Sequence, residues 1–190
     1  MSSETEVPPV RLVVTLPPMP SEVGADLRAE HPELIETRDV FRHVALQATK
    51  RLVFVVPFLD EVGGATLLEL YRLSGAAEKV LVCRDADDIR AAGRGLDREL
   101  IAAGVRIRSY KVHHVRPSAA VSIETFHSKI ALADATCAYV GSANAMRSSL
   151  ETTIECGVLL RGPAVLQVKS LVDVLLRHCS GASEPNVARE

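Results

Sequence analysis

The chain has 190 residues, of which 47% are hydrophobic and 24% charged, a balance that suits one compact globular domain with a sizeable core. Its net charge of -2 argues against broad coating of a polyanion, while leaving room for a local basic rim at a binding site. The four cysteines are widely spaced without a C-x-x-C pair, which argues against a zinc site or a disulfide framework and fits a reduced cytoplasm.

Residues 1–37 are predicted to form an N-terminal extension that is partly disordered. The start, MSSETEVPPV, lacks the basic and apolar regions of a signal peptide, so we expect a cytoplasmic protein. Val10 to Leu16 has the pattern of an edge strand, which the following prolines end. Ser21 is a candidate N-cap for a short helix that continues to Glu30.

Residues 38–179 are predicted to form the main domain, in which helical and strand patterns alternate. Thr37 is a candidate N-cap for the first of these helices. The predicted order is helix 38–50, strand 52–58, helix 64–73, strand 79–84, helix 96–103 and strand 105–110. Alternation of this kind indicates a layered α/β domain. The longest apolar run, Leu52 to Leu59, is too short to span a bilayer, so we expect no stable membrane insertion.

The C-terminal part is predicted to contain one more strand, in TIECGVLL, and then a long helix. Pro163 suits the first turn of that helix, and most of the helix's broad apolar surface should belong to the core. Residues 180–190, which are polar, are predicted to form a disordered tail.

Two polar stretches leave alternatives open. The acidic run Arg84 to Asp88 could bind a metal, although a solvated loop at a strand end is the simpler interpretation. The irregular stretch Lys111 to Thr125 is either a substrate-binding loop or an ordinary solvated connection. Its candidate substrate-binding residues are His113, His114 and Arg116.

The stretch from His127 to Asn144 contains the pattern H-x-K-x4-D-x6-G-S-x-N. At about 5% usage per residue type, six fixed types match a given start point roughly once in tens of millions. A lone histidine would be interpreted as a satisfied core residue, but the full pattern favours a functional site. Its fixed residues are His127, Lys129, Asp134, Gly141, Ser142 and Asn144.

The apolar residues inside this stretch predict two short strands joined at Asp134–Thr136. Because side chains alternate across a strand, His127 and Lys129 should point to the same face. A turn at Gly141–Ser142 would then bring Asn144 to the same rim.

An imidazole, an ammonium and an amide that converge can act on a phosphodiester. The imidazole of His127 can attack phosphorus, while Lys129 and Asn144 stabilise charge on the non-bridging oxygens. Lys129 supplies the cation that Mg²⁺ supplies in other phosphoryl-transfer enzymes, so we expect neither a metal nor another cofactor.

The pattern resembles the signature of the phospholipase D superfamily, which also includes small metal-independent nucleases, phospholipid synthases and a restriction enzyme. The order of helices and strands over residues 38–178 is similar as well. The resemblance implies a layered α/β fold, with a central mixed β-sheet flanked by helices on both faces.

The same resemblance implies a role for each residue. His127 would be the nucleophile, with Lys129, Ser142 and Asn144 binding phosphate, and Asp134 and Gly141 would be structural. Glu155, in the strand after the motif, would hold the second ring nitrogen of His127 and stabilise the imidazolium.

We therefore expect a metal-independent nuclease that acts through a phosphohistidine, on DNA more than on RNA. A phospholipid hydrolase and a catalytically quiet nucleic-acid-binding subunit remain as alternatives. Because the chain holds one copy of the motif, we expect a homodimer that shares one twofold site. The size and layout resemble proteins of DISARM-type anti-phage defence systems, which implies partners from such a system.

Overall fold

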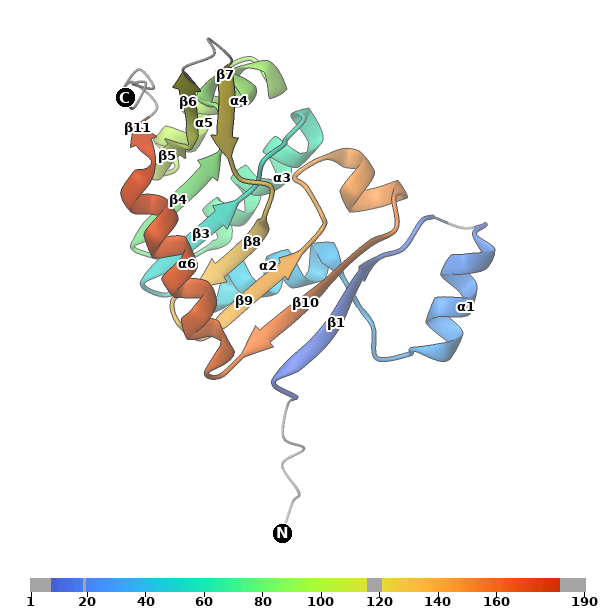
Figure 1. Cartoon of the computed structure of the whole chain (residues 1–190). Coiled ribbons are helices and arrows are strands. Elements are labelled where there is room, and N and C mark those ends of the chain that lie inside the picture. The colour runs from blue at the N-terminus through green and yellow to red at the C-terminus, as the bar shows by residue number, and fades with distance from the viewer. Residues whose placement is uncertain (1–7, 19, 116–120, 182–190) are drawn as a thin grey trace.

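A large sheet covered by helices on both faces forms the centre of the protein. The computed structural model describes residues 8–18, 20–115 and 121–181. Within these ranges, α6 (Ala164–His178) lies on one face of a nine-stranded sheet, and α2 (Thr37–Gln47) and α3 (Glu61–Leu73) lie on the other (Figure 1). The predicted α/β fold, with a central mixed sheet between helices, is confirmed.

The remaining elements complete this arrangement. The other helices are α1 (Glu22–Glu30), α4 (Ala86–Ala92) and α5 (Leu96–Ala102), with a π-helical turn, η1, at Ser148–Thr152. In spatial order, the strands of the sheet are β11 (Ser180–Gly181), β5 (Val105–Ser109), β4 (Glu78–Cys83), β3 (Arg51–Val55), β8 (Lys129–Ala133), β9 (Cys137–Gly141), β10 (Glu155–Arg161), β1 (Val10–Thr15) and β2 (Ile35–Glu36).

The directions of the strands bring distant segments to one edge. Strands β3, β4 and β5 are parallel, so they end at the same edge of the sheet, which we call the carboxyl edge. Strand β8 runs antiparallel to β3, with Val55 opposite Ile130, and therefore starts at that edge. Strand β9 ends there and β10 begins there, because each is antiparallel to its predecessor in the sheet.

Two hydrophobic cores lie on opposite faces of the sheet. Successive residues of β3 contribute their side chains to the two cores alternately. Leu52 and Phe54 face the helices α2 to α5, and Val53 and Val55 face α6. Helices on both faces explain why this strand reads as a continuous apolar run and not as an alternating one.

Helix α6 buries only one side of its apolar surface. Val165 and Val172 are fully buried against the sheet, whereas Leu166 and Leu171 are more than half exposed. The prediction that most of this surface is core therefore holds for one side of the helix only. No helix in the described part of the chain is long and apolar enough to cross a membrane.

The N-terminal strand β1 belongs to the central sheet. It pairs antiparallel with β10 over its whole length and parallel with β2, so the prediction of an edge strand is wrong. The long antiparallel pairing with β10 fixes it inside the sheet, where the two-residue β2 covers its other side. The division of the chain at residue 38 stays a prediction, and the predicted tail lies almost wholly outside the described residues.

The two predicted N-caps have different outcomes. Ser21 caps α1 as predicted, because its Oγ accepts a hydrogen bond from Gly24 N at 3.1 Å. Thr37 does not cap α2, whose N-cap is Glu36 without a side-chain hydrogen bond. Thr37 is instead buried in the first turn, where its Oγ1 accepts a hydrogen bond from Thr15 Oγ1 at 2.8 Å. Thr37 therefore forms a buried contact with Thr15 of β1 and does not cap the helix.

The stretch Lys111 to Thr125 is more regular than predicted. It forms an antiparallel hairpin of β6 (Lys111–Val115) and β7 (Val121–Thr125), located beyond the carboxyl edge (Figure 1). The two valines of β6 are three positions apart, with two histidines between them, so this short run lacks the strict alternation of a strand and gives a weak signal by itself. Pairing with β7 supplies the hydrogen bonds that make it a strand.

Candidate active site

The structure brings most of the motif residues together at the carboxyl edge. Lys129 is the first residue of β8 and His127 lies two positions before it, while Gly141 ends β9 and residues 142–144 follow. Lys129 is paired with Gly141 across β8 and β9, and Glu155 is the first residue of the next strand, β10. Residues spread over 29 positions of sequence thus meet because three antiparallel strands turn at this edge.

The side chains of His127 and Lys129 form a close pair. Lys129 Nζ lies 2.8 Å from His127 Nδ1 and 3.4 Å from Nε2, and it donates to the His127 carbonyl oxygen at 2.8 Å. An ammonium proton can approach an imidazole nitrogen only where that nitrogen carries a lone pair. A neutral imidazole is also the form of histidine that can attack phosphorus.

The two members of the pair differ in exposure. His127 is exposed, while the side chain of Lys129 is 4% exposed. Burial lowers the pKa of Lys129, because it penalises the charged ammonium, and the negative charge of Glu155 acts in the opposite direction. A largely desolvated cation beside an accessible imidazole suits the binding of an anion.

The Gly141–Asn144 loop is built around a buried tyrosine. Tyr139 points along β9 toward the loop, and its hydroxyl accepts a hydrogen bond from Ala143 N at 3.4 Å. A Cβ atom on Gly141 would lie 2.2 Å from this hydroxyl, and one on Gly157 would lie 2.5 Å from the ring. Glycine at both positions therefore makes room for the tyrosine that supports the loop. Burial raises the pKa of Tyr139 to about 12, so the phenol stays protonated.

The residues after Asn144 are fixed against the start of α3. Asp60 caps α3 through Gly63 N, and its carboxylate also accepts a hydrogen bond from Arg147 N at 2.8 Å. The backbone is so close here that a Cβ atom on Gly63 would lie 1.7 Å from the Ala145 carbonyl oxygen. Asn144 is therefore held at the rim by the backbone on either side of it.

The amide of Asn144 has unused hydrogen-bonding capacity. Its Oδ1 atom is buried and has no hydrogen-bond partner among the described residues. Buried polar atoms without partners are uncommon, so Asn144 is a candidate for a ligand contact.

Glu155 forms a hydrogen bond with Ser142. Its carboxylate accepts a hydrogen bond from Ser142 Oγ, which in turn accepts one from Cys156 N at 3.1 Å. The pairing of β9 with β10 brings Ser142 beside Glu155. The orienting contact from Glu155 to His127 stays a prediction, and Glu155 acts here as a negative charge near Lys129.

Asp134 lies at the opposite end of β8 from His127. It has a positive φ of 54° in the turn between β8 and β9. Its carboxylate accepts hydrogen bonds from the backbone N–H groups of residues 49–51 and from the Thr49 hydroxyl, at 2.6 to 3.1 Å. Burial alone would raise the pKa of Asp134, but these hydrogen bonds outweigh it and lower the pKa.

Replacing Asp134 with asparagine is expected to destabilise the protein by about 2 kcal/mol without moving the site residues. Asparagine tolerates the positive φ, but it lacks one acceptor oxygen and turns an N–H group toward donors. Because the folded-state pKa of Asp134 is lowered, its stabilisation is present above about pH 4 and is lost as the pH falls through the folded-state pKa.

Denaturant unfolding of the wild type and the Asp134→Asn variant at several pH values measures this effect. The difference in unfolding free energy should be constant between pH 5 and 8 and shrink in acid. Asp26→Asn, an exposed change in α1, is the matched control. Equal stability of Asp134→Asn and Asp26→Asn at pH 7 would contradict the structural role.

The structure places two further residues beside the site that the sequence analysis did not single out. The Phe58 and His127 rings meet edge to face, with centroids 5.7 Å apart. Arg84 lies over the Phe58 ring, with its Cζ atom 4.9 Å from the centroid. Both residues follow the ends of buried parallel strands, and that position is the signal that could have found them.

The candidate substrate residues of the hairpin are only partly described. His113 lies in β6 and is half-buried. The side chain of His114 and the whole of Arg116 lie outside the described residues. Lys111, at the base of the hairpin, forms an ion pair of 3.1 Å with Asp85.

The acidic run Arg84 to Asp88 forms the start of a helix. Asp85 caps α4 by accepting a hydrogen bond from Asp87 N, in addition to its ion pair with Lys111. Among the described residues, no group of three His, Cys, Asp or Glu side chains is placed to hold a metal ion.

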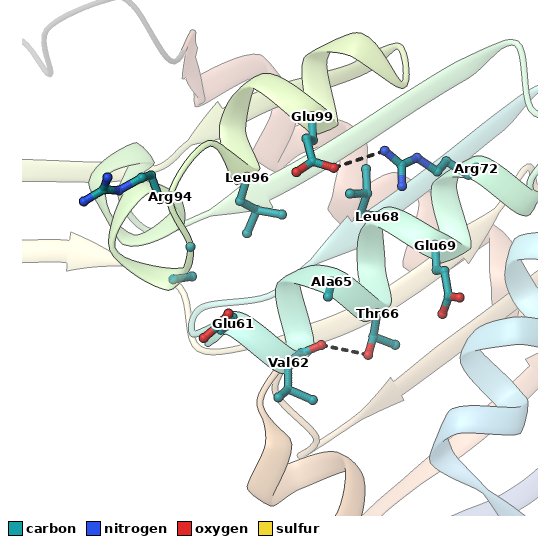
Figure 2. A pocket seen from close by; sticks show the side chains of 12 residues that line it. Glu61, Val62, Ala65, Thr66, Leu68, Glu69, Arg72, Arg94, Leu96 and Glu99 are labelled. Atoms are coloured by element: carbon teal, nitrogen blue, oxygen red, sulfur yellow. Dashed lines mark hydrogen bonds and ion pairs between the residues drawn. The ribbon is translucent and has the colours of Figure 1, made fainter.

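A hollow of about 630 Å³ lies between α3 and the α4–α5 segment and is separate from the motif residues (Figure 2). Arg72 and Glu99 form an ion pair of 3.1 Å beside it, and Leu68 and Leu96 are among its apolar lining residues. None of the predicted site residues lines it.

A mixed sheet with a histidine–lysine pair and a Gly-Ser-x-Asn loop at one edge places this α/β protein in the phospholipase D class, a superfamily whose members act on phosphodiesters. Residues 42–173 match the family model described as "Cardiolipin synthase, PLD-like domain". This match spans more than half of the chain, so the protein belongs to the PLD-like domain family. The curated proteins contain no match.

Solved structures share the fold at low sequence identity. NucT from Helicobacter pylori has a TM-score of 0.57 and 12% identity, with 90% of this chain and 99% of that chain covered. Nuc from Salmonella typhimurium, a phospholipase D family member, has a TM-score of 0.57 and 13% identity, with 90% of this chain and 96% of that chain covered. The phosphatidylserine synthase of Haemophilus influenzae has a TM-score of 0.56 and 15% identity, covering 90% of this chain but 39% of its own.

Proposed function

We propose that the protein is a metal-independent phosphodiesterase that cleaves nucleic acid, DNA in preference to RNA, through a phosphohistidine at His127. The exposed imidazole of His127 beside the buried ammonium of Lys129, 2.8 Å from Nδ1, is the observation that carries this proposal. The likeness in fold and length to Nuc and NucT favours nucleic acid over lipid as the substrate.

The reaction consists of two displacements at phosphorus. A ring nitrogen of His127 forms a bond to phosphorus while the bond to the leaving oxygen breaks, and an acid protonates that oxygen. Water then attacks phosphorus and gives a proton to the group that acted as the acid in the first step, the P–N bond breaks, and the imidazole is released with a phosphomonoester. Lys129 and the amide of Asn144 stabilise the negative charge on the non-bridging oxygens in both steps.

The acid in the first step comes, in this proposal, from a second copy of the chain. One chain carries one copy of the motif, and its His127 is exposed at an open edge of the sheet. A C2 dimer with the two carboxyl edges facing each other would bring a second His127, Lys129 and Asn144 to one shared site. His113 or His114 of the same chain is the competing candidate for the acid.

The setting of the reaction is part of the same proposal. The likeness in size and order of elements to DISARM-type proteins supports a role in anti-phage defence, with other defence proteins as partners. A cytoplasmic location and a substrate of invading DNA are consistent with that role.

A substrate panel with excess EDTA tests the proposed function. We expect purified protein to hydrolyse bis(p-nitrophenyl) phosphate and single-stranded or duplex DNA at the same rate with and without EDTA. The physical reason is that Lys129 already supplies the cation at the phosphate. Loss of activity with EDTA, restored by Mg²⁺, would contradict the proposal.

The same panel separates the alternatives. Hydrolysis of phospholipid in liposomes without cleavage of DNA or RNA would favour the phospholipid hydrolase. The family description and the phosphatidylserine synthase likeness make that test necessary. A gel shift that weakens with salt, without cleavage of any substrate, would favour a binding subunit.

A further inference from the structure

Arg84 lies next to the nucleophile through a shared aromatic ring. It directly follows β4, just as Phe58 follows the neighbouring strand β3. The Arg84 guanidinium lies over the Phe58 ring, at 4.9 Å from the centroid, and the His127 ring meets the same Phe58 ring at 5.7 Å. Three neighbouring strands of the sheet therefore place Arg84, Phe58 and His127 in one row along the carboxyl edge.

The positive charge of Arg84 has no carboxylate partner among the described residues. Its Nε atom is buried and has no hydrogen-bond partner there. The adjacent carboxylate of Asp85 is already used by Lys111 Nζ and by the first turn of α4. Stacking on Phe58 holds the guanidinium in place but satisfies none of its N–H donors. A buried donor in this state is explained if a ligand supplies the acceptor.

We propose that Arg84 binds a phosphate that flanks the scissile phosphodiester in a polynucleotide substrate; this rests on the proposed function. The planar guanidinium fork matches phosphate oxygens. Lys129 occupies the position next to the His127 imidazole, where the scissile phosphate would bind. Arg84 contacts Phe58, which in turn contacts His127, so Arg84 suits the phosphate next to the scissile one. A polynucleotide, unlike a small diester, carries such a neighbouring phosphate at every nucleotide of the strand.

The test compares substrates with and without flanking phosphates. In Arg84→Gln, KM for a short single-stranded DNA should rise on the order of ten-fold, with kcat changed much less. The same variant should lose kcat/KM for bis(p-nitrophenyl) phosphate by a factor at least several-fold smaller than for DNA, because this small diester has one phosphate. Loss of one phosphate contact should also reduce the salt dependence of DNA binding, by roughly 0.7 in the log–log slope.

Two variants complete the design. Arg84→Lys keeps the positive charge but loses the planar guanidinium, so it should recover part of the DNA affinity that Arg84→Gln loses. Arg94→Gln removes an exposed arginine between α4 and α5 with the same change in net charge, and it should behave as wild type. Thermal unfolding of each variant shows whether the fold is kept.

The outcomes separate this proposal from the proposed function. Equal losses on DNA and on the small diester would assign Arg84 to the scissile phosphate, and no loss on either would make it a packing residue; both results overturn the proposal. If the wild type cleaves nothing, DNA affinity is measured by fluorescence anisotropy for His127→Ala with and without Arg84→Gln. Weaker binding of the double variant than of His127→Ala supports the Arg84 site even then, and equal binding rejects it.

Discussion

Replacing His127 with alanine is expected to lower turnover of DNA and of bis(p-nitrophenyl) phosphate by roughly 10⁴-fold or more, because the proposed nucleophile is lost. Lys129 and Asn144 would still bind the phosphate, so affinity for DNA should fall far less than turnover. His127 is exposed, and the contacts of its ring that the described residues show are an edge-to-face contact with Phe58 and the Lys129 ammonium. The unfolding free energy should therefore change by about 1 kcal/mol or less.

Labelled substrate gives a more direct measurement of the same step. A reaction with DNA that carries label on the transferred phosphate, stopped by detergent at alkaline pH, should leave label on wild-type protein. Alkaline conditions are needed because the P–N bond of a phosphohistidine is cleaved by acid. The His127→Ala protein should carry none.

A matched histidine provides the control for this experiment. His31 lies at the end of α1, away from the carboxyl edge, and His31→Ala removes the same ring. That variant should keep both turnover and label. Turnover by His127→Ala within ten-fold of the wild type, or label on that variant, would remove His127 from the nucleophile's role.

The layers of the fold could be predicted from local patterns, because helical and strand periods alternate regularly along most of the chain. The run after Lys50 is apolar on both faces, as a strand with helices on either side requires. The place of β1 could not be predicted in the same way. Its partner β10 begins at Glu155, 140 positions from Thr15 in the sequence, and no local pattern encodes such a pairing.

The convergence of the site could also be predicted, since it depends on strand alternation and one turn. His127 and Lys129 are two positions apart, and Lys129 pairs with Gly141 where the loop to Asn144 begins. The partners of the charged groups could not be predicted, because they depend on which side chains adjacent strands bring together. Ser142 reaches Glu155 in this way, and Phe58 joins Arg84 to His127.

A purified heterodimer of one wild-type chain and one His127→Ala chain is expected to lose nearly all turnover. In the proposed C2 dimer, the two His127 rings serve one site, one as nucleophile and the other as the acid that protonates the leaving oxygen. Removing either ring leaves that site without one of its two functions. Independent sites, each using His113 of its own chain as the acid, would instead leave half of the wild-type turnover.

The heterodimer can be isolated by co-expressing the two chains with different affinity tags and purifying on both tags in turn. Wild-type dimers with both tags, taken through the same steps, set the reference rate, and light scattering reports the oligomeric state at the assay concentration. Because a shared site exists only in the dimer, specific activity should also fall when the protein is diluted below its dissociation constant. Half of the reference rate in the heterodimer, or full activity in a monomer, would reject the shared site and leave His113 as the acid to test next.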